Sequence, residues 1–476
     1  IAASRAADAV MLVALAGMAA IGSLVAYAES GDRRHLVVAA VAVGAGLAGG
    51  PRFVTLIFVL LIAAVLWRLL DGDGVLTAVD RLRGAGQVEP SPQSAGRARI
   101  AGIAIGVFLI GSSALLTYRP GLAASAQALP IWFAGWLPTQ AGRDWLHLLT
   151  VLVVYEPLML LFGLASMARL AIRGSQKRSA AWLSATCAIA AFAAGLVYAG
   201  RTSDDVVWIV IPLTGLASLF VVELLWGDWA EIDVSAVAVH SALVVVLLTY
   251  AGINVAAFSE AQGTLAGSAQ FINLMLGGTA VLLVAVISLL FGVGWSAEGA
   301  ARGAVVGMSV VLLFADTSGA RHLTRWGESH EIASELWHSG ASIPASGLRM
   351  LTLTLEDVSD RAVGAPHDIK LAVNAPRDGA LAWALRDFHA ASYLDALAAT
   401  IDAPAVIAPA EQTTPQLGSA YVGQSFAVRA RLDTAAIGPT DWVNWLAFRR
   451  APLTMEKIVL WVRSDVQFRT GEGKKP

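Results

Sequence analysis

Charged side chains are scarce in this sequence. Asp, Glu, Lys and Arg make up 14% of its 476 residues, and the mean hydropathy is +0.66, whereas soluble domains carry about 25% charge. This deficit excludes an ordinary soluble protein. Long apolar stretches recur over roughly the first 300 residues, which is typical of an integral membrane protein. The formal net charge of −2 does not favour nucleic acid as a partner.

Cysteine and the common catalytic motifs are also nearly absent. The single cysteine, Cys187, lies in an apolar run, so a disulfide framework is excluded and a small buried side chain is expected. The sequence contains no G-x-S-x-G, no Walker A motif and no HExxH. Nothing therefore points to a hydrolase, an ATPase or a zinc protease.

Apolar stretches of about 20 residues are the length that crosses a bilayer as a helix. Ten are predicted, at about 7–28, 36–50, 53–70, 100–118, 148–172, 180–199, 207–226, 236–258, 273–295 and 303–315. The polar connection 71–99 is predicted to be a disordered linker. The connection 119–147 mixes Trp and Pro, and we expect it to lie on the bilayer surface, where Trp is enriched.

The distribution of Lys and Arg predicts an orientation in the membrane. The connections that would be cytoplasmic hold most of the basic residues if Ile1 faces outward, as the positive-inside rule requires. An even number of spans then places the C-terminal segment outside as well. We expect a multi-pass protein of the plasma (inner) membrane, in contact with membrane lipid.

A change in composition near residue 316 predicts two domains, a transmembrane helical bundle at 1–315 and an extracytoplasmic α/β domain at 316–476. Strands are predicted at "LRMLTLTLE", "DIKLAVN", "APAVIAP", "SFAVRARLD" and "EKIVLWVR", and helices at "GALAWALRDF" and "DWVNWLAFRR". Alternation of strands with helices favours a small domain with a partly parallel sheet. The predicted fold class is a polytopic α-helical membrane protein with a C-terminal α/β domain.

The glycines of "GAGLAGGPR" match G-x-G-x-x-G through Gly44, Gly46 and Gly49. A dinucleotide site needs a strand before this motif, whereas here the motif ends an apolar span, so it indicates close helix packing instead. Arg52 follows at the predicted outer mouth of a helix. Its guanidinium has the geometry to bind a lipid phosphate, and simple interfacial placement is the alternative.

Two further groups of charges are candidates for a polar site. Arg5 and Asp8 share a helical face in "SRAAD", either as an ion pair or with Arg5 directed at an anionic substrate. Arg201 precedes the adjacent carboxylates Asp204 and Asp205, which either bind sugar hydroxyls or a divalent cation or cap the next helix.

Glu156 lies within an apolar span and directly before Pro157. An ionisable residue inside a span is a functional candidate by default, and a Glu that reaches water or Tyr155 is the alternative. No set of residues is predicted as a metal centre. The expected cofactor is therefore none, with a divalent cation as the alternative.

The order of these features resembles the GT-C type membrane glycosyltransferases, and more closely the flippase-associated membrane protein branch related to the protein mannosyltransferases. The resemblance is carried by the segments "SRAADAVM", "GLAGGPRFVTLI", "DDVVWIVIPLTGLA", "GALAWALRDF", "WVNWLAFRRAP" and "KIVLWVRSD". The chain departs from the family pattern at Arg52, where relatives tend to have Lys. It departs again at residues 203–205, where they have a Glu-Lys pair.

The resemblance implies transfer of a sugar from a polyprenyl-phosphate carrier, at the outer face of the membrane, to a glycan or protein acceptor. It implies donor-phosphate binding by Arg5, Arg52 and Arg201, with Asp8, Asp204, Asp205 and Glu156 as further polar candidates. It also implies that the catalytic carboxylate lies upstream of Ile1, in an N-terminal part that this sequence lacks. A non-catalytic protein that assists translocation of lipid-linked glycans is the main alternative. A transporter fits less well, because no repeated halves are visible.

Overall fold

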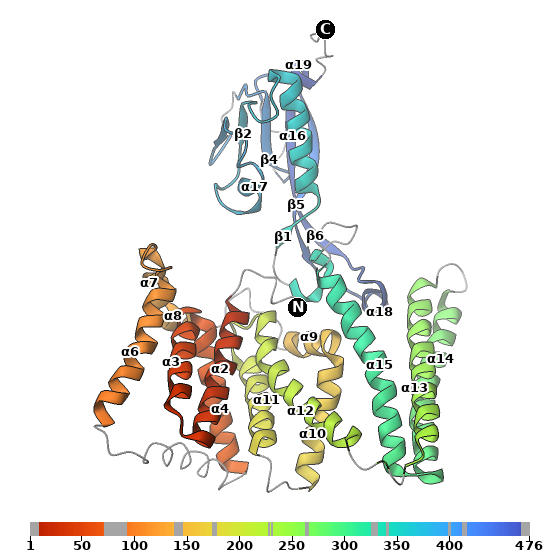
Figure 1. Ribbon diagram of the computed structural model, residues 1–476. Helices are drawn as coiled ribbons and strands as arrows, with labels where there is room; N and C mark the ends of the chain where they lie inside the picture. Colours follow the sequence, from red (N-terminus) through yellow and green to blue (C-terminus); the bar gives the residue numbers. More distant parts are fainter. Residues whose placement is uncertain are drawn as a thin grey trace, which may run out of the picture. The chain divides into compact units, whose positions relative to one another are not determined.

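The computed structural model describes most of the chain and divides it into two compact units, Ile1–Thr324 and Arg325–Pro476 (Figure 1). The described residues are 9–70, 93–137, 146–173, 179–226, 229, 232–261, 266–324, 332–338, 342–397, 401–411 and 417–467. The predicted boundary after residue 315 falls inside the last helix of the first unit, which continues to Thr324. Residues 316–324 are therefore helical and belong to the bundle.

The first unit is built from helices. They are α2 (Val10–Ser30), α3 (Arg33–Ala48), α4 (Pro51–Leu70), α6 (Gln93–Ser112), α7 (Arg119–Ala126), α8 (Ala128–Ala134), α9 (His147–Tyr155), α10 (Pro157–Arg173), α11 (Ser179–Val197), the 3-10 turn η1 (Ser203–Val206), α12 (Val207–Leu225), α13 (Val234–Glu260), α14 (Ala266–Gly294) and α15 (Ala297–Thr324). Every stretch that the sequence predicts as a span overlaps one or more of these helices. The stretches 36–50 and 100–118 overlap α3 and α6, which are not among the described helices that are long and apolar enough to cross a membrane.

Seven helices among the described residues are long and apolar enough to cross a membrane. Helices α9 and α10 add an eighth if they form one broken span, which bends by 103° between Tyr155 and Pro157. Pro157 causes the break, because proline has no N–H to donate and its ring clashes with the preceding turn. The chain is thus a polytopic helical membrane protein.

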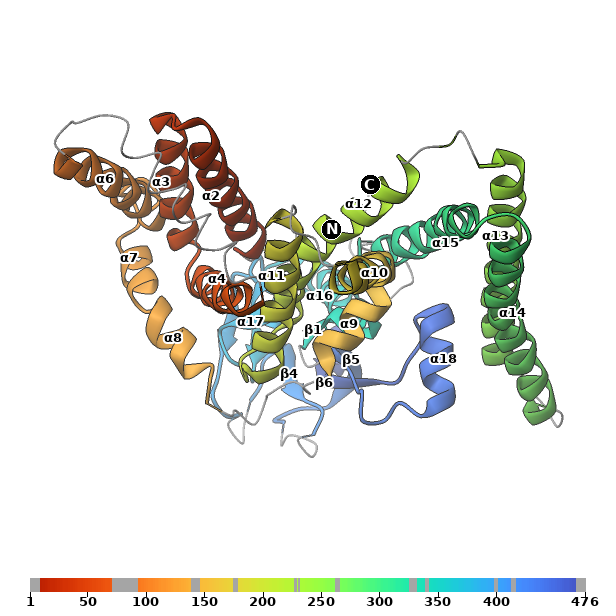
Figure 2. The ribbon, with the colours of Figure 1, turned by 90° about the horizontal axis from the view of Figure 1, so that it is seen from below.

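Small residues let α3 pack closely against its neighbours α2 and α6 (Figure 2). A Cβ atom at Gly44 would lie 2.4 Å from the carbonyl oxygen of Ala104 on α6, and one at Gly46 would lie 2.2 Å from the ring of Phe53. These glycines permit backbone approach, as small residues do in membrane helix pairs. The predicted packing role of the glycine motif is confirmed.

The second unit contains a six-stranded mixed sheet with the order β1-β5-β6-β4-β2-β3. Its strands are β1 (Ile343–Pro344), β2 (Leu371–Val373), β3 (Ala391–Tyr393), β4 (Ala405–Pro409), β5 (Tyr421–Leu432) and β6 (Leu453–Arg463). Strand β2 runs parallel to β3 and β4, and the other pairs are antiparallel. The predicted partly parallel sheet is confirmed.

The helices of this unit are α16 (Gly347–Val363), α17 (Gly379–Ala384), α18 (Pro439–Phe448) and α19 (Ser464–Gln467). The stretch "LRMLTLTLE", predicted as a strand, lies in α16. Its alternating Leu and Thr mimic a strand, but the buried positions Leu351, Leu355 and Val358 follow the helical spacing of three and four residues. These side chains join the hydrophobic core between α16 and the sheet.

The connection 119–147 also differs from the prediction of a surface loop, because its described part forms α7 and α8. Trp132 on α8 is buried, and α8 packs against α4. The ring therefore belongs to the interior of the helical unit. Trp145, the last tryptophan of this connection, lies outside the described residues.

Candidate functional site

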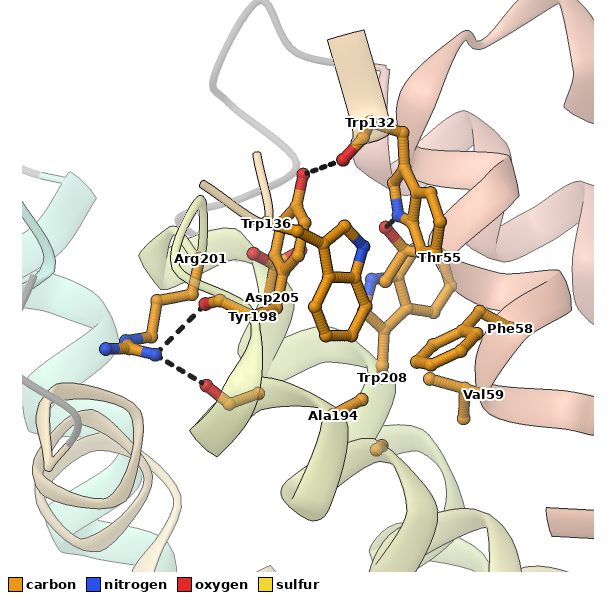
Figure 3. A pocket seen from close by; sticks show the side chains of 12 residues that line it. Thr55, Phe58, Val59, Trp132, Trp136, Ala194, Tyr198, Arg201, Asp205 and Trp208 are labelled. Carbon is orange, nitrogen blue, oxygen red and sulfur yellow. Dashed lines mark hydrogen bonds between the residues drawn. The ribbon is translucent and has the colours of Figure 1, made fainter. Parts of the chain in front are cut away.

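A recess lies at one end of the helical unit, where α4 begins, α11 ends and α12 begins. The space between its atoms is about 350 Å³, a figure that includes space open to the surroundings. Its lining residues are Thr55, Phe58, Val59, Trp132, Trp136, Ala191, Ala194, Gly195, Tyr198, Arg201, Asp205 and Trp208 (Figure 3). Aromatic rings thus dominate its wall.

Arg52 binds both carboxylates of the predicted acidic pair. Its Nη1 donates a hydrogen bond of 2.9 Å to Oδ1 of Asp205, and its Nη2 lies 3.8 Å from Oδ2 of Asp204. The Asp205 side chain is 7% exposed, whereas those of Arg52 and Asp204 are 19% and 17% exposed. One guanidinium and two carboxylates carry a formal charge of −1, so the cluster has more negative than positive charge.

Asp205 is held in place by its own turn. Its Oδ2 accepts hydrogen bonds from the backbone N–H of Thr202 at 2.7 Å and from Oγ1 of Thr202 at 3.3 Å. This is a capping box at the start of η1, an arrangement that satisfies exposed N–H groups at a helix start. The predicted capping role is confirmed for Asp205, and the same residue also fixes Arg52.

Arg201 has a structural role at the end of α11. Its Nη1 donates to the carbonyl oxygens of Gly195, Leu196 and Tyr198 at 3.0–3.3 Å. These carbonyls lack partners within the helix, and a cation is favourable at a helix C-terminus. Figure 3 shows the guanidinium pointing away from the aromatic rings. The prediction that Arg201 binds donor phosphate stays a prediction.

The aromatic wall is a network of rings in mutual contact. Trp136 meets Phe58, Trp132 and Tyr198 edge to face, with centroids 5.4, 5.5 and 5.4 Å away. The indole of Trp132 donates to Oγ1 of Thr55 at 3.1 Å, and the hydroxyl of Tyr198 donates to the carbonyl of Trp132 at 3.3 Å. These bonds join α4, α8 and the end of α11 into one wall.

The ionisation of Tyr198 reflects this environment. Burial raises the pKa of its phenol, the charge of Asp205 raises it further, and the charge of Arg52 opposes that effect. Tyr198 is therefore neutral at physiological pH and acts as a hydrogen-bond donor. No motif in the sequence singles out Tyr198, Phe58 or Thr55. The one available signal was the closeness of Tyr198 to "RTSDD" in the sequence.

A buried polar pair supports the turn that carries the carboxylates. Nε2 of His147 on α9 lies 3.0 Å from Oγ of Ser203 in η1, and both side chains are buried. The contact connects the bent helix pair to the acidic turn. The position of η1 is thus fixed from two sides, by α9 and by α4 through Arg52.

Glu156 does not line the recess. It occupies the break between α9 and α10, and its charge is close enough to repel that of Asp316 on α15. A different carboxylate, Glu223 on α12, pairs with Arg169 on α10 at 3.7 Å. Glu223 therefore joins α10 to α12 through its ion pair with Arg169.

The remaining predicted site residues, Arg5 and Asp8, lie outside the described residues. Within the described part of the chain, no group of three or more His, Cys, Asp or Glu side chains is arranged to hold a metal ion. The site consists of an ion-paired polar cluster beside an aromatic wall. Comparison of the chain with protein-family models, with curated proteins and with solved structures found no match.

Proposed function

We propose that the protein is a membrane glycosyltransferase that uses a polyprenyl-phosphate-linked sugar donor at the outer face of the plasma membrane. The observation that supports this best is the ion pair of Arg52 with Asp205, a residue that lines a recess walled by Trp and Tyr rings. A lipid-linked sugar presents a phosphate next to a ring that has apolar faces and polar edges. Arg52 is suited to the phosphate, and the Trp and Tyr rings of the recess are suited to the apolar faces of the sugar ring.

The phosphate would bind at Arg52. Its guanidinium has a planar fork that matches phosphate oxygens. Asp205 is anchored by Thr202, whereas Asp204 makes the longer contact of 3.8 Å and is more exposed. An incoming phosphate therefore replaces Asp204 at Nη2, and Asp205 keeps the guanidinium in position.

In the transfer itself, the hydroxyl oxygen of the acceptor forms a bond to the anomeric carbon of the sugar. The bond from that carbon to the phosphate oxygen breaks, and polyprenyl phosphate leaves with the electron pair. A base takes the hydroxyl proton. Asp205 accepts bonds from Arg52 and Thr202, so we assign it to positioning.

A second candidate is a non-catalytic protein that assists translocation of lipid-linked glycans. The engagement of Asp205 favours it, because Arg52 and Thr202 already donate hydrogen bonds to both oxygens of that carboxylate. In both cases the C-terminal α/β domain faces the extracytoplasmic side and contacts the glycan or protein acceptor. The two candidates differ in whether a glycosidic bond is made.

The test is sugar transfer by the protein, reconstituted in vesicles with radiolabelled polyprenyl-phosphate hexose and acceptor glycan. We expect labelled product, with donor use weakened about tenfold or more in Arg52→Ala, since a charged hydrogen bond contributes about 1.5–3 kcal/mol. Arg68→Ala, at the opposite end of α4, is the matched control and should keep wild-type donor use. Absence of product, together with intact donor binding, would replace the enzyme by the second candidate.

A further inference from the structure

Trp208 holds a buried hydrogen-bond donor at the recess. Its side chain is 5% exposed, and its indole Nε1 has no hydrogen-bond partner in the part of the chain that the structure describes. Buried indole N–H groups usually find an acceptor, because a missing hydrogen bond there costs free energy. Since Trp208 lines the recess, a ligand in the recess is able to supply that acceptor.

Trp136 offers a ring surface in the same recess. It is half-buried, and Phe58, Trp132 and Tyr198 meet it at interplanar angles of 80°, 74° and 71°. Three nearly perpendicular neighbours fix the orientation of the indole before any ligand arrives. Figure 3 shows Trp208 and Phe58 drawn together with this group. Such preorganisation reduces the entropy cost of binding.

We infer that the recess binds the pyranose ring of a sugar, with Nε1 of Trp208 donating to a sugar oxygen and Trp136 covering an apolar C–H face. The inference rests on the proposed function and assigns the sugar part of its donor to named residues. Asp205, whose carboxylate also lines the recess, is placed to accept a hydrogen bond from a sugar hydroxyl. A pyranose satisfies all three groups, because it has oxygen acceptors, hydroxyl donors and apolar faces.

Two other ligands fit an aromatic recess less well. A quaternary ammonium head group is attracted by aromatic faces, but it has no acceptor for Nε1 of Trp208, and Arg52 already offsets the charge of Asp205. An apolar lipid tail would leave the indole N–H of Trp208 without an acceptor, which is unfavourable in a buried site. The polar donor of Trp208 therefore selects a ligand with oxygen acceptors.

The test compares two lipids that differ only in the sugar. Binding of polyprenyl-phosphate hexose and of polyprenyl phosphate is measured with the chain in phosphatidylglycerol vesicles, for wild type and Trp208→Phe. The substitution keeps an aromatic ring and removes the N–H. We expect about threefold to tenfold weaker binding of the sugar-bearing lipid, the range of one hydrogen bond, and unchanged binding of polyprenyl phosphate.

Trp226→Phe is the matched control, because Trp226 stands at the other end of α12 with 81% of its surface exposed. It should change neither affinity. Equal affinities of wild type and Trp208→Phe for the sugar-bearing lipid would overturn the inference, as would an equal loss for both lipids. Displacement of the sugar-bearing lipid by dodecylphosphocholine, with no effect of Trp208→Phe, would assign the recess to a quaternary ammonium group. These binding outcomes are independent of whether transfer occurs, so failure of the proposed function stays distinguishable.

Discussion

Arg52 and Asp205 form a hydrogen-bonded ion pair of 2.9 Å across 153 positions of the sequence. The pair joins the first turn of α4 to the turn before α12. Each partner is fixed by local sequence, since Pro51 begins α4 and Thr202 caps η1. The geometry makes the roles of the two neighbouring carboxylates, Asp204 and Asp205, experimentally separable.

Asp205→Asn should destabilise the helical unit. The substitution leaves a mostly buried guanidinium with its weaker partner Asp204, and breaking a buried pair costs on the order of 3 kcal/mol. The measurement is the thermal unfolding midpoint in detergent, followed by tryptophan fluorescence. An unchanged midpoint would show that the ion pair makes no net contribution to stability.

Asp204→Asn should strengthen the binding of polyprenyl phosphate. Removing this charge takes away a competitor for Nη2 of Arg52, so polyprenyl phosphate should bind more tightly, by about threefold to tenfold for an interaction of about 1 kcal/mol. The affinity is measured in vesicles at low ionic strength, where such interactions are least screened. Weaker binding in Asp204→Asn would mean that Asp204 itself contributes to the ligand site.

Arg201→Gln should lower stability without changing the affinity for donor. The guanidinium bonds three carbonyls at the end of α11, and charged hydrogen bonds contribute about 1.5–3 kcal/mol. Thermal unfolding and lipid binding are measured on the same preparation. A selective loss of phosphate binding at unchanged stability would support the donor-binding role that the sequence predicts for Arg201.

Gly44→Ala should disrupt the contact between α3 and α6. The added Cβ would lie 2.4 Å from the carbonyl oxygen of Ala104, and overpacking of this kind costs about 1–3 kcal/mol. Gly106→Ala is the control on α6, because a Cβ there meets nothing within 4 Å. Its unfolding midpoint should equal or exceed that of wild type, since Ala favours helix over Gly.

The helical unit was largely predictable from hydropathy, because the length and apolar character of a span are local properties. Arg52, Asp204 and Asp205 were each identified as candidates. Their mutual contact was not, since no local pattern reveals which helix ends meet in space. For the same reason the burial of Trp132 was not predicted. Composition placed the connection 119–147 at the bilayer surface, whereas contacts within the fold bury this side chain.

The C-terminal unit shows a different limit. The strands of "APAVIAP" and "EKIVLWVR" are short apolar runs rich in β-branched residues, and both predictions are confirmed. In "LRMLTLTLE" the Leu residues satisfy a period of two over five positions, which is too short a stretch to exclude a helix. The burial of Val358 beyond that stretch completes the helical pattern, so a longer segment of sequence distinguishes a helix from a strand here.

The ionisation of Tyr198 gives a direct measure of the charge beside the recess. Its pKa is raised above the ordinary value of 10.0 by burial and by the charge of Asp205, so the folded state favours the protonated phenol. The resulting contribution to stability is fully present below the unfolded pKa and is lost as the pH rises through the folded pKa.

Comparison of wild type with Tyr198→Phe by ultraviolet difference titration should therefore reveal a phenol that ionises at higher pH than an exposed tyrosine does. In Asp205→Asn the pKa of Tyr198 should fall but stay above the ordinary value, because burial is the larger cause. A pKa of Tyr198 that does not respond to Asp205→Asn would show that the carboxylate charge is screened from the recess.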